Sequence, residues 1–314
     1  MADAMGSGFA ALGRGVALAA LTAVLAVEAL PGRALAQSGT QAETQTEAQT
    51  EAQAGTAAAL RPEVAALMET MRIADIVAIL REEGIDYGRT LEADMFPGAG
   101  GSGWEATVAL IYDGARMQEA FGASLNTALE GQGEATEAAR AFFGSDVGQK
   151  VLELEIEARR ALLDEATEEA AKVAWEEMSA EGGARVDLLE AFVAANDLVE
   201  SNVMGALNSN LAFYQGMAEG GAFGDEMTEE QMLADTWAQE PEIRASTSDW
   251  IYPYLALAYG PLSDEELQQY IDFSLSPAGQ ALNVALFTAF DDVFTPVSKA
   301  LGLAVARQMQ GQDI

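Results

Sequence analysis

The chain has 314 residues, contains no cysteine and no histidine, and carries a formal net charge of −34. The missing cysteine excludes disulfides, thiol catalysis and thiolate metal sites, and the missing histidine excludes Ser-His-Asp and Cys-His hydrolases and the histidine-containing zinc and di-iron sites. The negative charge should repel nucleic acid and anionic membrane surfaces.

The first 36 residues have the pattern of a secretory signal peptide. Arg14 precedes an apolar stretch from Val16 to Val27, which is too short for an ordinary membrane span. Ala34-Leu35-Ala36 fits a signal-peptidase site, so we expect cleavage between Ala36 and Gln37. Because Glu28 interrupts the apolar region, an uncleaved N-terminal anchor is the alternative. We expect the mature protein in the periplasm or outside the cell.

Residues 37–58 are near-repeats of Thr-Glu-Ala-Gln without a large apolar side chain, which predicts a disordered linker. From about Leu60 onward, apolar residues recur at helical spacing, as at Val64, Leu67 and Met68, and strand alternation is absent over any useful length. The sequence therefore predicts an all-α protein. We expect an N-terminal helical domain at 59–180 and a C-terminal helical domain at 184–314.

Two stretches have a chemical pattern that their context does not support. GAGGSG at 98–103 is a literal G-x-G-x-x-G, but a dinucleotide site requires a buried strand immediately before it, and Glu92, Asp94 and Pro97 stand there instead. We expect a loop between helices. The carboxylates from Glu153 to Glu177 include pairs at helical spacing that could bind calcium or act as acid and base. Without an EF-hand spacing, we interpret them as a solvated face, and we predict no metal site and no cofactor.

The stretch DWIYPYLALAYG, from Asp249 to Gly260, is the best candidate for a ligand surface. Aromatic rings with polar groups suit stacking on sugars or other ligands, and the candidate residues are Trp250, Tyr252, Tyr254 and Tyr259. Pro253 fits the first turn of a helix that ends near Gly260, so some of these rings should face the core.

LSDEELQQYIDFSLSPAGQAL, from Leu262 to Leu282, contains two helix starts. Ser263 and Glu266 have the spacing of a capping box, and Ser276 followed by Pro277 is a cap followed by the residue best suited to the first helical position. The short connection predicts two antiparallel helices. Gly279 costs helix stability, so we expect it where two backbone segments approach closely.

The same pattern stands 131 residues earlier. EATEAARAFFGSDVGQKVL, which begins at Glu134, aligns without a gap on EELQQYIDFSLSPAGQALN, which begins at Glu265. The frame continues as far as Met178 on Met309. It predicts an internal repeat, and hence two related antiparallel helical bundles. The alternative is a coincidental alignment of two amphipathic helices.

The pattern LSDEEL…Y…F…SPAGQAL resembles the C-terminal signature of a secreted bacterial helical family, the domain of unknown function 2059. The resemblance is clearest over the last sixty or so residues and weaker from Leu129 to Met178. It implies an exported all-helical protein and transfers no catalytic residue. The residues that match the motif, which we interpret as fold-determining, are Phe273, Ser276, Pro277, Gly279 and Gln280.

Two classes of function remain open. The first is a non-catalytic envelope protein that has a structural role or binds a protein or an apolar small molecule between its helices. The second is a hydrolase that uses carboxylates alone, such as a glycosidase. The second class requires an Asp/Glu pair about 5 to 9.5 Å apart at a buried cleft, with at least one raised pKa.

Overall fold

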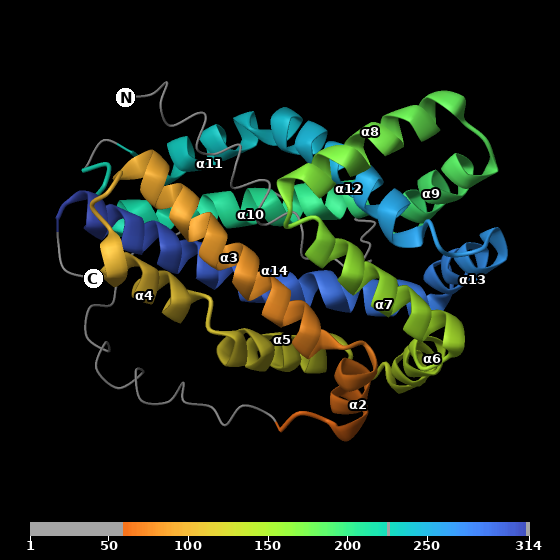
Figure 1. The fold of residues 1–314 in the computed structure, drawn as a ribbon. Helices are drawn as coiled ribbons and strands as arrows, with labels where there is room; N and C mark the ends of the chain where they lie inside the picture. The colour runs from red at the N-terminus through yellow and green to blue at the C-terminus, as the bar shows by residue number, and fades with distance from the viewer. Residues whose placement is uncertain (1–58, 225–226, 312–314) are drawn as a thin grey trace, which may run out of the picture.

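The computed structural model describes residues 59–224 and 227–311, and every regular element in them is an α-helix (Figure 1). The all-α prediction is confirmed. The predicted signal peptide and linker lie outside the described residues. The helices are α2 (Pro62–Thr70), α3 (Ile73–Met95), α4 (Gly101–Ile111), α5 (Gly114–Ala128), α6 (Gly133–Phe143), α7 (Asp146–Ala161), α8 (Glu165–Glu181), α9 (Ala184–Ala195), α10 (Leu198–Glu219), α11 (Glu229–Ala238), α12 (Glu240–Tyr259), α13 (Asp264–Ser274) and α14 (Pro277–Met309).

Local sequence fixes several helix starts. At the start of α13, the hydroxyl of Ser263 accepts a hydrogen bond from the Glu266 amide at 3.2 Å, and the Glu266 carboxylate accepts from the Ser263 amide at 2.7 Å. This is the predicted capping box. Thr228 and Gln231 form the same arrangement at the start of α11.

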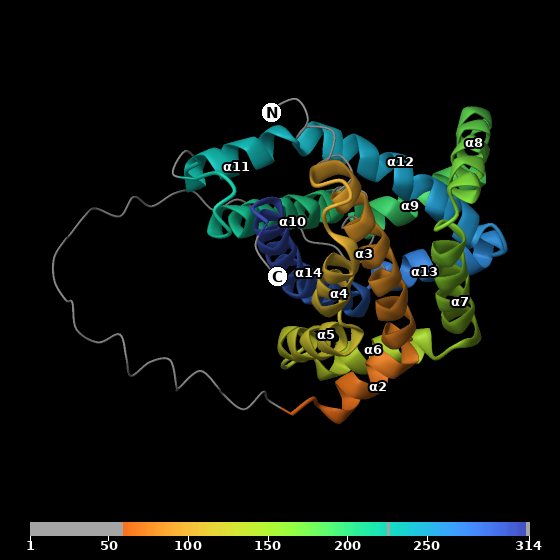
Figure 2. The same ribbon diagram turned by 60° about the vertical axis from the view of Figure 1, so that its left-hand side comes forward.

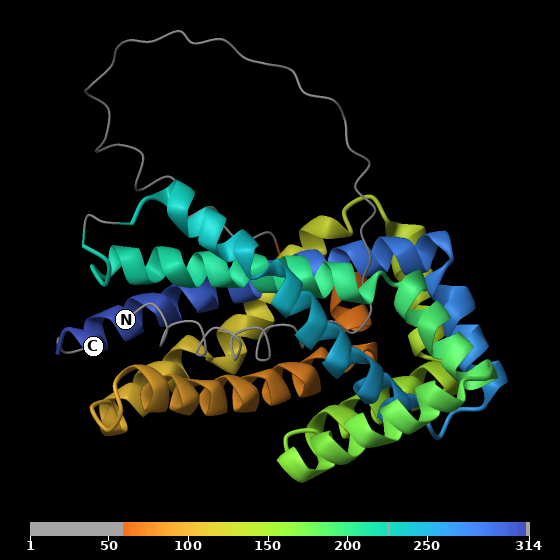
Figure 3. The ribbon, with the colours of Figure 1, turned by 90° about the horizontal axis from the view of Figure 1, so that it is seen from above.

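Helix α14 is the central element and packs against α10 on one side and α5 on another (Figures 1 and 3). Glycine permits the close contact with α10. A Cβ atom added at Gly216 would lie 2.0 Å from the carbonyl oxygen of Lys299, and one added at Gly302 would lie 2.1 Å from that of Phe213. Because real Cβ contacts are much longer, the two backbones touch only where a side chain is missing.

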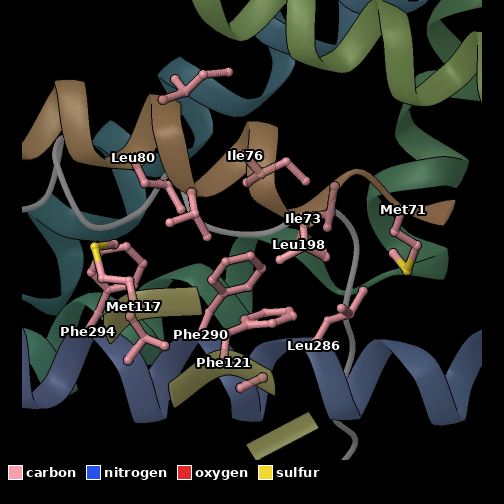
Figure 4. Packing of buried hydrophobic residues seen from close by; sticks show 14 of the residues in the cluster. Met71, Ile73, Ile76, Leu80, Met117, Phe121, Leu198, Leu286, Phe290 and Phe294 are labelled. Carbon is pink, nitrogen blue, oxygen red and sulfur yellow. The ribbon is translucent and has the colours of Figure 1, made fainter. Parts of the chain in front are cut away.

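The hydrophobic core runs through most of the helices, and one part of it lies between α3, α5 and α14 (Figure 4). Ile76 and Leu80 extend from α3 toward Phe290 on α14, and Phe121 on α5 packs against Phe290 with ring centroids 4.8 Å apart. The cluster contains side chains from both ranges predicted as domains. Burial of these apolar side chains is the main source of stability available to a chain without disulfides.

Two helices lie at the edge of the molecule. Helix α8 packs on α12 (Figure 2), and Gly182 and Gly183, both with positive φ, connect it to α9. The boundary expected between 180 and 184 coincides with this connection; the division into two domains stays a prediction. Helix α11 packs on α10. No helix in 59–224 or 227–311 combines the length and the apolar character needed to cross a membrane.

Candidate functional site: two helix corners and a buried carboxyl

The short connections between α6 and α7 and between α13 and α14 are built alike, and we call them the first and the second corner. The second corner comprises residues 273–280. The Ser276 hydroxyl accepts from the Gly279 amide at 3.1 Å and donates to the Phe273 carbonyl at 2.6 Å, while Pro277 occupies the first helical position. A Cβ atom at Gly279 would lie 2.1 Å from the Phe273 oxygen. The predicted close approach is therefore present, and it holds the end of α13 against the start of α14.

Gln280 connects the second corner to a third helix. Its side-chain amide donates to the Ser274 carbonyl at 2.7 Å and to the carbonyl of Ala195, the last residue of α9, at 3.2 Å. Carbonyls at helix ends have no partner within their own helix. Gln280 satisfies two of them at once and fixes α9 beside the corner.

The first corner is the junction of α6 and α7 at residues 142–149, and it has the same contacts. Ser145 accepts from the Gly148 amide at 3.1 Å and donates to the Phe142 carbonyl at 2.6 Å. A Cβ atom at Gly148 would lie 2.2 Å from the Phe142 oxygen. Gln149 donates to the carbonyl of Thr70, the last residue of α2, at 3.0 Å. Each position stands 131 residues before its counterpart, except Thr70, which stands 125 before Ala195.

The two corners contact each other. Phe142 and Phe273 stack with ring centroids 4.2 Å apart and an interplanar angle of 3°. Beside them, the Lys150 ammonium contacts the Glu266 carboxylate at 2.7 Å. The equivalent phenylalanines of the two corners therefore meet at their common boundary.

The parallel between the two halves ends after α7. In the 131-residue frame, α8 corresponds to the second half of α14, but α7 stops at Ala161 while α14 continues. Asp164 starts a new helix because its carboxylate accepts from the Thr167 amide at 2.9 Å. The two sequences still align without a gap over this stretch, but the first half has a break between two helices where α14 is continuous.

A buried carboxyl lies on α7, six residues after Gln149 of the first corner. Glu155 is 2% exposed, and one of its oxygens accepts a hydrogen bond from the Tyr259 hydroxyl at 2.6 Å. Burial raises the pKa of this carboxyl to about 8, against the opposing effect of hydrogen bonds from the Tyr259 and Tyr270 hydroxyls. Its other oxygen, Oε2, has no hydrogen-bond partner among the described residues. Burial therefore favours the neutral form of Glu155 at pH 7.

Arg159, the basic residue nearest to Glu155 along α7, forms an ion pair with a different carboxylate. The Arg159 guanidinium makes two hydrogen bonds to the Glu83 carboxylate on α3, at 2.8 and 2.9 Å, with both side chains nearly buried. Tyr254 donates to the Glu155 backbone carbonyl at 3.3 Å, and burial and the Glu155 carboxyl both raise the pKa of its hydroxyl. The junction of α7, α12 and α13 thus holds a buried acid and buried tyrosines, next to an ion pair that joins α7 to α3.

The carboxylates from Glu153 to Glu177 were predicted to form a solvated face. Glu153 and Glu157 are exposed as expected, but for Glu155 the prediction is wrong, because its side chain is buried. Glu155 lies between them in sequence but on the opposite side of α7. The available signal was helical spacing, since position 155 lies on the same face as Val151 and Leu152.

The four aromatic residues predicted as a ligand surface do not form one surface. Tyr259 is buried in the core. Trp250 and Tyr254 stack on each other at 4.8 Å, and Tyr252 stacks on Trp175 of α8 at 5.0 Å. These rings attach α7 and α8 to α12, and a role in ligand binding stays a prediction.

A surface hollow of about 430 Å³ lies elsewhere, at α2, α3 and α5. Neither the predicted aromatic residues nor Glu155 line it. Its lining residues are Leu60, Ala65, Met68, Glu69, Arg72, Ala74, Asp75 and Gln118.

The glycine-rich stretch at 98–103 is only partly the loop that was expected, because α4 already begins at Gly101. One oxygen of the Glu92 carboxylate accepts from the Gly100 and Gly101 amides, at 3.1 and 3.2 Å. A negative charge of the chain itself therefore occupies the helix N-terminus, the place where a phosphate would bind.

Comparison with known families gives one match. The family described as an uncharacterized protein conserved in bacteria (DUF2059) matches residues 132–177, which span α6, α7 and most of α8. The sequence resemblance placed the clearest similarity in the last sixty residues, and this location is corrected: the match falls on the first corner. Comparisons with curated proteins and with solved structures find no match.

Proposed function

We propose that this chain is an exported, non-catalytic helical protein of the bacterial envelope, where it acts as a binding or structural component. The signal-peptide pattern at 1–36 supports export, and the description of the matching family supports a bacterial setting. The observation that carries the non-catalytic part is the position of Glu155. The carboxyl whose pKa is raised to about 8 is enclosed in the core and lies away from the surface hollow.

We also infer that the two corners are copies of one ancestral unit, so that the C-terminal copy extends the family resemblance beyond the matched residues. The matching hydrogen bonds of Ser145 and Ser276, and of Gln149 and Gln280, support this. Further support comes from Arg72 and Asp197, the non-glycine residues with positive φ in 59–224 and 227–311, which follow α2 and α9 at equivalent places. Duplication of a corner that serves packing fits a scaffold.

Cell fractionation and intact mass test the proposal. The full-length chain is expressed in a Gram-negative host, and the periplasmic and cytoplasmic fractions are analysed by native mass spectrometry. We expect a periplasmic species whose mass corresponds to a start at Gln37. A chain of full mass from Met1 that is confined to the cytoplasm would overturn the export proposal.

The carboxylate-only hydrolase is the second candidate, and the raised pKa of Glu155 is the observation in its favour. A glycosidase needs a second carboxylate at the same cleft, and nearby Glu83 is engaged by Arg159. Assays of the periplasmic protein on glycoside substrates distinguish the two proposals. Hydrolysis that Glu155→Gln abolishes would favour the enzyme.

A further inference from the structure

Helix α11 has an outer face that no described residue covers. Leu233 is 45% exposed and Trp237 is 51% exposed, one helical turn apart on the same side of the helix. Met232 and Thr236, on the inner side, are buried. We call Leu233 and Trp237 the α11 face. Helix α11 itself lies at the edge of the molecule, on the far side of α10 from α14 (Figures 1 and 2).

Trp237 differs from the other tryptophans of the chain. Trp104 is buried, and Trp175 and Trp250 stack on tyrosines. No ring of 59–224 or 227–311 stacks on Trp237. An exposed tryptophan is typical of the anchor residues of protein interfaces, and the exposed leucine beside it adds apolar surface.

The α11 face is held in a fixed position. The capping box at Thr228 fixes the start of the helix. At the other end, Gln239 accepts from the Asn210 side chain at 3.0 Å, and donates to the Tyr214 hydroxyl and to the Asp235 carbonyl, both at 3.1 Å. A face that is already ordered loses little conformational entropy when it binds.

The sequence that carries the face is acidic. Residues 229–243 contain five carboxylates and no lysine or arginine. The first basic side chain is Arg244, whose guanidinium already contacts Glu200 and Glu240, each at 2.6 Å. A partner that covers Leu233 and Trp237 would therefore need positive charge around its apolar residues.

We propose that the α11 face binds a basic helical segment of a partner protein that carries apolar side chains at helical spacing. This rests on the proposed function as a binding component. Leucine-type side chains of the segment would cover Leu233, while lysine or arginine would lie over the Trp237 ring and near the surrounding carboxylates. Anionic membranes and nucleic acid carry the wrong charge.

A titration with defined peptides tests the proposal. The probe is a leucine–lysine peptide of roughly 18 residues, or five helical turns, with its leucines on one face. A lysine–serine peptide of equal charge reports purely electrostatic attraction to so acidic a protein. Both are titrated calorimetrically into the wild type, Trp237→Ala, Leu233→Ala and the matched control Leu110→Ala. Leu110 is 63% exposed on α4, far from α11 in sequence.

We expect Trp237→Ala to weaken binding of the leucine–lysine peptide about tenfold or more, and Leu233→Ala several-fold. Leu110→Ala should bind like the wild type, and the lysine–serine peptide should not distinguish the variants. Equal affinities of the wild type and Trp237→Ala would overturn the proposal. So would attachment to phosphatidylcholine vesicles that Trp237→Ala abolishes. Fractionation tests export separately. If the protein is exported but binds the peptide equally well without Trp237, the docking proposal is wrong and the proposed function stands.

Discussion

Replacing Glu155 with glutamine should make the protein less sensitive to pH. Glutamine has nearly the same shape and keeps an oxygen that accepts from the Tyr259 hydroxyl, but it never ionises. In the wild type the carboxyl has a pKa of about 8 in the folded protein, against an ordinary value of 4.5. The substitution thus isolates the cost of ionising one buried acid.

The direction in which stability changes with pH follows from the number of protons that the folded and unfolded states bind. Below pH 4.5 the carboxyl is neutral in both states and has no effect on pH dependence. Between pH 4.5 and about 8 the unfolded chain ionises while the folded protein keeps its proton, so wild-type stability falls as pH rises. The loss is about 1.4 kcal/mol per pH unit and about 5 kcal/mol over the whole interval. It levels off above pH 8.

Urea unfolding followed by circular dichroism, from pH 4 to pH 9, measures this difference. We expect the free energy of unfolding of Glu155→Gln, minus that of the wild type, to rise steadily between pH 4.5 and 8. The matched control is Glu153→Gln, which removes an exposed carboxyl from the same helix and should give a nearly flat difference. A flat difference for Glu155→Gln as well would refute the burial of an ionisable acid.

Three further predictions use the same unfolding assay. Gly279→Ala should destabilise the protein by about 3 kcal/mol, because the new Cβ would lie 2.1 Å from a backbone oxygen. Gly205→Ala, in an open place within α10, should stabilise it by about 0.5–1 kcal/mol, and equal effects of the two would contradict the close approach. Phe142→Leu and Phe273→Leu should show a coupling of about 1 kcal/mol in a double-mutant cycle, and additive effects would count against stacking. Arg159→Met leaves a nearly buried carboxylate on α3 without its cation and should cost about 3–5 kcal/mol; a loss below about 1 kcal/mol would show that the pair is solvated.

The helix starts were predictable because the residues that cap a helix lie within a few positions of each other in the sequence. Ser263, Ser276 and Thr228 each bond to an amide three residues later, and this spacing is visible in the sequence. The close approach at Gly279 was also predictable, because glycine destabilises a helix and is expected there only where a side chain would not fit.

What the sequence did not predict depends on contacts between distant segments. The stack of Phe142 on Phe273 joins residues that are 131 positions apart. Likewise, Tyr252 finds its partner on α8 because that helix turns away after α7. The burial of Glu155 was visible as spacing, but the rise in its pKa depends on complete burial, to which residues such as Tyr259, 104 positions away, contribute. Contacts between segments that are far apart in the chain leave no recognisable pattern in the local sequence.

The position of α14 has a consequence for the order of events during synthesis. This helix, which supplies the centre of the core, is also the one that comes latest in the sequence. Helices made earlier, such as α3, α5 and α10, have their apolar faces uncovered until it emerges. Chains are made from the N-terminus, and contacts between distant segments form late. The core that these helices share is therefore completed only after α14 has been made.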